Sequence, residues 1–92
     1  MISRQLIDNF IRMFKEKKYQ ELIDKSDILT SIEERPSGLS NLIGLSKNFL
    51  KQPSKEYIIS SLDDFKDAYL KEKNKIFGIE ALCNLITIAV QN

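Results

Sequence analysis

The amino-acid sequence predicts a single all-α domain. Along almost the whole chain of 92 residues, apolar residues recur at the three- and four-residue spacing of an amphipathic helix. The period-two alternation of a half-buried strand does not occur in the sequence. The segments between the apolar stripes are short, and short connections fold consecutive helices into antiparallel neighbours. The sequence therefore favours helical hairpins, either stacked in a row or closed into a five-helix bundle.

Five apolar stripes define the expected helices. They lie within residues 6–14, 19–32, 39–50, 58–69 and 79–90. The first stripe ends at the Lys17-Lys18 pair, and Pro36 ends the second stripe because proline cannot continue a helix. Pro53 follows the third stripe, and Ser54 is a suitable N-cap for the fourth helix because its hydroxyl can accept a bond from an unpaired backbone amide. The basic run at 71–75 is interpreted as a solvated connection.

Composition and charge exclude several classes of protein. Hydrophobic residues make up 42% and charged residues 29% of the chain, with 3 glycines and 2 prolines, which excludes collagen-like, low-complexity and disordered sequences. A net charge of +1 gives no broad attraction to nucleic acid or to an anionic membrane. No stretch reaches the roughly 20 apolar residues that a membrane span requires. The single cysteine and the polar N-terminal segment favour a reducing, cytoplasmic compartment.

Nothing in the sequence indicates a reaction centre. The chain has no histidine, which removes the commonest general base and metal ligand, and it has no glycine-rich phosphate loop. Cys83 lies on an apolar stripe and is interpreted as a buried small hydrophobe. Asp63, Asp64 and Asp67 are interpreted as part of a solvated helix face, and the lysine clusters at helix ends as solvated too. We therefore expect no enzyme activity, no catalytic residue, no metal and no cofactor.

An internal repeat points to a family. The segment Leu39-Ser-Asn-Leu-Ile-Gly-Leu-Ser46 recurs as Leu82-Cys-Asn-Leu-Ile-Thr-Ile-Ala89, and both copies open the first helix of an expected hairpin. With these segments the chain resembles the tetratricopeptide repeat family. Further positions resemble the family pattern: Tyr19 at the start of a second helix, Pro36 near the closing proline, Gly44 in the Leu-Gly opening, and Ser61, Phe65 and Ala68 as a small–aromatic–small triad.

This resemblance implies about two and a half degenerate repeats stacked as a right-handed superhelix. The repeats span residues 4–37 and 38–75, with a third first helix at 76–90. Small residues let the two helices of a repeat approach closely, so Gly44, Ser61 and Ala68 are expected at a close contact. Phe10 and Lys47 depart from the family pattern: Phe10 stands at a glycine position, so the first two helices should lie further apart, and Lys47 replaces the usual tyrosine.

The resemblance also implies a function, that of a non-catalytic protein–protein interaction module. In the family, the first helix of each repeat lines a concave groove that takes an extended peptide or a partner helix. Carried over by position, the groove residues here are Asn41, Leu42, Leu45, Asn48 and Phe49 from the second repeat and Asn84, Leu85, Ile88 and Gln91 from the third. Asparagine suits this role because its amide both donates and accepts hydrogen bonds.

An alternative function is the N-terminal recognition arm of a truncated enzyme. The opening of the chain resembles the repeats that precede the catalytic domain in some bacterial sulfotransferases and glycosyltransferases. On this interpretation the arm recognises a partner and performs no chemistry itself.

The last expected helix is apolar or small on nearly all sides between residues 76 and 90. In proteins in water this pattern predicts helix contacts on more than one face, and the preceding hairpin can cover only one of them. We expect either that the natural chain continues or that the helix pairs with its counterpart in a homodimer, with Leu85 and Ile88 near the contact.

Overall fold

The computed structural model describes residues 2–72 and 76–91, and within these residues it contains α-helices, one short 3-10 helix and no strand. The elements are α1 (Arg4–Lys15), α2 (Tyr19–Leu29), η1 (Ile32–Glu34), α3 (Ser37–Phe49), α4 (Lys55–Lys71) and α5 (Ile76–Gln91). The predicted all-α class is confirmed. In the described part of the chain, every helix is too short or too polar to cross a membrane.

Serine caps fix where two helices begin. The backbone amide of Tyr57 donates to Oγ of Ser54 at 3.1 Å, which confirms Ser54 as the N-cap of α4. Ser3 caps α1 in the same way, since it accepts a bond from the amide of Leu6 at 3.2 Å. The break predicted at the lysine pair is also present, and Lys17 turns the chain there with a left-handed φ of 61°.

The second helix is shorter than its apolar stripe suggests. It ends at Leu29, and Ile32 belongs to the separate turn η1. The cause is Arg35, whose buried guanidinium group donates from Nε to Oγ1 of Thr30 at 2.8 Å and from Nη2 to the carbonyl of Ser26 at 3.2 Å. These bonds satisfy polar groups at the C-terminal end of α2 and hold the chain in its turn toward α3.

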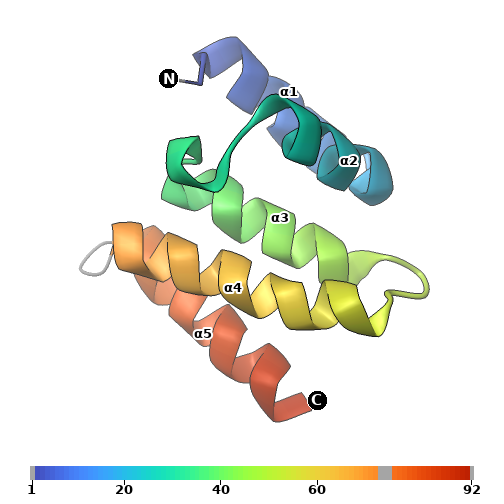
Figure 1. The fold of residues 1–92 in the computed structure, drawn as a ribbon, viewed down its shortest axis with the longest axis vertical. Coiled ribbons are helices and arrows are strands. Elements are labelled where there is room, and N and C mark those ends of the chain that lie inside the picture. The colour runs from blue at the N-terminus through green and yellow to red at the C-terminus, as the bar shows by residue number, and fades with distance from the viewer. Residues whose placement is uncertain (1, 73–75, 92) are drawn as a thin grey trace.

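α3 lies at the centre of the helix array (Figure 1). It packs against α1 and α2 on one side and against α4 and α5 on the other, so that the first hairpin and α5 lie at opposite ends of the molecule. α3 and α4 contact each other much more extensively than α1 and α2 do. This difference agrees with the expectation that Phe10 keeps the helices of the first hairpin apart.

Two packing centres hold the array together. The first joins α1, α2 and α3 through buried side chains, namely Phe10, Met13, Leu22, Leu39 and Ile43. The second lies between α3 and α4, where the ring of Phe65 rests directly on Gly44: a Cβ atom added to this glycine would lie 2.6 Å from Cε1 of the ring. Ser61 and Ala68 are fully buried beside Phe65. The predicted close approach is confirmed at Gly44 and at Ser61, whose Oγ accepts a hydrogen bond from Nδ2 of Asn48 of α3.

Candidate binding groove

A groove of about 550 Å³ opens between α1 and α3 and reaches residues of the α4–α5 end. Most of its lining is apolar. The lining residues are Ile7, Ile11, Phe14, Pro36, Ser37, Gly38, Leu39, Asn41, Leu42, Leu45, Glu72 and Glu80. The groove therefore combines an apolar floor with a small number of polar groups, as binding sites for peptides and small molecules do.

α1 supplies one wall because it carries two apolar stripes. Phe10 and Met13 are buried in the core, whereas Ile7, Ile11 and Phe14 follow one another at four- and three-residue spacing on the neighbouring face. Ile11 remains 39% exposed. The second stripe is visible in the sequence, but the predicted site drew only on the later helices and so missed this wall.

α3 supplies the floor through three of the predicted residues. Asn41, Leu42 and Leu45 all line the groove, as expected. Asn41 is only 6% exposed, and its Oδ1 accepts a hydrogen bond from Nδ2 of Asn84 at 3.0 Å. The two asparagines that match each other in the internal repeat thus contact each other, and their bond joins α3 to α5.

The structure places the other predicted residues elsewhere. Asn48 points toward α4, where its Nδ2 donates to the carbonyl of Gly44 and to Oγ of Ser61, both at 2.9 Å. Phe49 packs its ring against those of Phe14 and Tyr19, with centroid distances of 5.9 and 5.7 Å.

On α5, Leu85 is half-buried and is not among the described residues that line the groove. Ile88 lines a separate hollow against α4, together with Ile58 and Leu62. Gln91 is exposed at the last position of the helix. The expected groove residues therefore lie on several surfaces. Of these residues, Asn41, Leu42 and Leu45 line the groove between α1 and α3.

The charged groups at the groove are acidic. Glu72 caps the C-terminal end of α4, and Glu80 lies in the first half of α5. Among the described residues that line the groove, these two are the charged ones, so the groove offers negative charge at one end and apolar surface over the rest. A cationic group on a ligand would be favoured at that end.

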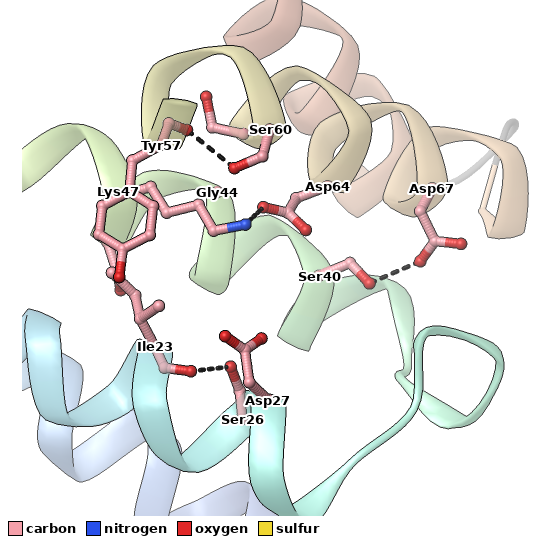
Figure 2. A network of polar contacts seen from close by, with 12 residues as sticks. Ile23, Ser26, Asp27, Ser40, Gly44, Lys47, Tyr57, Ser60, Asp64 and Asp67 are labelled. Carbon is pink, nitrogen blue, oxygen red and sulfur yellow. Dashed lines mark hydrogen bonds and ion pairs between the residues drawn. The ribbon is translucent and has the colours of Figure 1, made fainter. Parts of the chain in front are cut away.

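The opposite side of α3 is closed by a polar layer, defined by Ser40 and Lys47 of α3 with Asp64 and Asp67 of α4 (Figure 2). Nζ of Lys47 lies 2.7 Å from Oδ2 of Asp64, and both side chains are about nine-tenths buried. Oγ of Ser40 donates to Oδ2 of Asp67 at 2.6 Å. Burial raises the pKa of the Asp64 carboxyl above its ordinary value, and the hydrogen bond and charge of Lys47 only partly offset this effect.

This layer corrects the interpretation of the acidic cluster on α4. Asp63 is exposed, but Asp64 is buried and Asp67 is half-buried, so the latter two do not belong to a solvated face. The buried face of α4 consists of Ser61, Asp64, Phe65 and Ala68 at helical spacing. The small side chains of Ser61 and Ala68 let α3 lie close to this face, and Asp64 falls within the same stripe.

Lys71 and Cys83 also differ from their sequence interpretations. Nζ of Lys71 lies 2.9 Å from Oδ2 of Asp67, and it donates to the carbonyls of Ile32 and Arg35 at 2.7 and 2.6 Å, so it holds the η1 turn instead of lying free in a solvated run. Lys73 and Lys75 lie outside the described residues. Cys83 is exposed, which contradicts its interpretation as a buried hydrophobe.

Comparison with known proteins adds no relative: no family model, no curated protein and no solved structure matches the chain. Over residues 2–72 and 76–91, no group of three His, Cys, Asp or Glu side chains could hold a metal ion. Function is therefore inferred from the groove itself.

Proposed function

We propose that the protein is a non-catalytic interaction module that binds a peptide or partner helix in the groove between α1 and α3. The observation that carries the proposal is the second apolar stripe of α1. Ile7, Ile11 and Phe14 line the groove together with Leu42 and Leu45 of α3. Phe14 and Leu42 also pack against the core, yet all five side chains remain at least partly exposed. Apolar side chains left partly in water around a concave surface favour burial by a partner.

The resemblance to the tetratricopeptide repeat family supports the same surface. In that family the first helices of the repeats line the groove, and α1, α3 and α5 stand at the corresponding positions of this sequence. α1 and α3 supply most of the groove lining here, and α5 contributes Glu80. The Asn41–Asn84 hydrogen bond fixes the distance between α3 and α5 on this side.

The groove also defines the chemistry of its ligand. Its apolar part suits two or three apolar side chains spaced along one face of a helix or along an extended peptide. Its acidic end, where Glu80 is exposed, suits a lysine or arginine of the ligand. Asn41 holds Asn84 through its Oδ1 and can donate from Nδ2 to a backbone carbonyl of the ligand. We therefore infer a ligand with an apolar face and a basic residue at one end.

A peptide-display selection on the 92-residue chain tests this function. Peptides that bind the wild-type chain are measured by calorimetry against Ile11→Lys, which places a charge on the α1 wall of the groove. The matched control is Ile28→Lys on α2, where an isoleucine is 79% exposed outside the groove. We expect Ile11→Lys to weaken binding by about tenfold or more, the effect of losing about 1.4 kcal/mol of contact, and Ile28→Lys to leave it unchanged.

Two outcomes contradict the proposal. One is a selection that yields no peptide with affinity for the wild-type chain. The other is a set of peptides whose affinity is equally insensitive, or equally sensitive, to both substitutions while circular dichroism shows both variants folded.

A further inference from the structure

α5 carries a second apolar stripe that the rest of the described chain does not cover. Its inner stripe packs toward α3 and α4 and consists of Gly78 and Ala81, which are buried, with Leu85 and Ile88, which are half-buried. Its outer stripe points away from them. The outer stripe consists of Ile79 (54% exposed), Cys83 (exposed), Ile86 (51% exposed) and Val90 (79% exposed).

The outer stripe has the residue spacing of a helix–helix interface. Its members follow one another at intervals of four, three and four residues, which is the alternation of the a and d positions in a heptad repeat. Exposed apolar side chains also occur at the end of α2 and in η1, at Ile28, Leu29 and Ile32, but the outer stripe continues along one helix for about three helical turns. A continuous apolar row of this length at the surface is typical of an interface.

We propose that the outer stripe pairs with the outer stripe of a second copy of this chain, in antiparallel orientation across a two-fold axis. A two-fold contact uses the same patch on both copies, so the patch must complement itself. The outer stripe meets this condition because it is apolar throughout. Glu80 is the single charged residue of α5. Residues 81–91 carry no charged side chain, so pairing two copies along this segment would bury no unpaired charge.

Charge selects the antiparallel orientation. In a parallel pair the two Glu80 carboxylates would come to the same end of the contact and repel each other, and the two helix dipoles would align side by side in the same direction. In an antiparallel pair the two glutamates lie at opposite ends and the dipoles oppose. The stripe then matches itself about its midpoint: Cys83 faces Ile86 of the partner subunit, and Ile79 faces Val90 of the partner subunit.

This contact differs in detail from the one expected from the sequence. Leu85 and Ile88 lie on the inner, half-buried side of α5, and Ile88 lines the hollow against α4. The outer stripe is the part of α5 that a second copy can reach. The contact is independent of the proposed peptide groove, which lies between α1 and α3.

Light scattering coupled to size exclusion measures the association. Over a series from about 1 μM to about 500 μM, which spans the dissociation constants of weak homodimers, we expect the wild-type chain to approach twice its mass of 10.7 kDa. Ile86→Lys should stay at the monomer mass at every concentration, and the matched control Ile28→Lys should dimerise like the wild type. Circular dichroism establishes that both variants keep their helix content.

Some results would overturn the proposal. A wild-type chain that stays monomeric over the whole series shows that the outer stripe does not pair with a second copy. A dimer that survives Ile86→Lys, or one that Ile28→Lys abolishes equally, shows that the copies meet through a different surface.

Disulfide cross-linking tests the orientation separately. In a background of Cys83→Ala, one chain carries Ile79→Cys and another carries Val90→Cys. The antiparallel pair places positions 79 and 90 of different copies together, so an oxidised equimolar mixture should cross-link and each variant alone should not. Cross-linking of each variant alone, or a dimeric mixture that does not cross-link, would overturn the antiparallel arrangement.

Discussion

The two faces of α3 have opposite character. Toward α4 the helix is tightly closed, with Gly44 against the ring of Phe65 and Lys47 buried against Asp64. Toward α1 it is open, and Leu42 and Leu45 line a groove that the protein's own side chains do not fill. The closed face carries the polar and charged residues that look functional in a sequence. The open face carries ordinary leucines. The difference teaches that the buried charges of α3 and α4 hold the fold together, whereas the apolar surface left open toward α1 is the surface that we propose for binding.

Removing one partner of the buried ion pair should produce the largest effect on stability. Asp64→Ala leaves the Lys47 ammonium buried without its carboxylate, which should lower the free energy of unfolding by about 3 kcal/mol. The measurement is urea unfolding followed by circular dichroism. The matched control is Asp63→Ala at the exposed neighbouring position, which should change stability by less than about 0.5 kcal/mol.

A double substitution sharpens this prediction. Lys47→Met with Asp64→Leu removes both charges together and should recover most of the loss, because an apolar pair of similar volume needs no desolvation of charge. If Asp64→Ala and Asp63→Ala have the same small effect, the closed face does not depend on the ion pair.

Filling the closest contact should produce an intermediate effect. A methyl group at Gly44 would lie 2.6 Å from Phe65, so Gly44→Ala should cost about 1–3 kcal/mol in spite of the higher helix propensity of alanine. Gly38 of the same helix is the matched control. Apart from its adjacent residues and the nearby backbone of its own helix, no described atom lies within 4 Å of a Cβ added there. Gly38→Ala should be neutral or stabilising. Equal effects of the two substitutions in thermal unfolding would show that α3 and α4 are not closely packed at Gly44.

Acid should produce the smallest effect, with a defined sign. Burial raises the pKa of Asp64 in the folded state above its ordinary value of 3.8. As the pH rises through 3.8, the unfolded chain loses this proton first, so the contribution of Asp64 to stability falls until the folded-state pKa is passed. The unfolding free energy of the wild type minus that of Asp64→Asn should therefore be most positive below pH 3.8 and should fall as the pH rises. A difference that grows with pH would mean that Lys47 lowers this pKa.

Helical periodicity predicted most of the fold, because local signals determine where these helices lie. The proline breaks and the Ser54 cap follow from the properties of single residues, and the contact at Gly44 follows from the family resemblance together with the small size of glycine. The end of α2 did not follow, because Arg35 bonds groups that lie five and nine residues earlier in the chain.

The candidate site was predicted only in part. Asn41, Leu42 and Leu45 line the groove, but Asn48 bonds Ser61 across the hairpin, a contact that depends on how closely α3 and α4 approach. Asp64 could have been placed correctly, since it lies three residues after Ser61 and four before Ala68 on one helix face. That signal was hidden because serine and alanine do not stand out as an apolar stripe.

Methyl-resolved NMR of the chain titrated with a peptide selected on the wild type tests the central claim most directly. If the groove is the binding site, chemical-shift changes concentrate on the methyl groups of Ile7, Ile11, Leu42 and Leu45. The methyl groups of Ile23 and Ile28 on α2 keep their positions. Changes centred on α2, or on the α4 side of α3, would contradict the claim that this protein binds through the open face of α3.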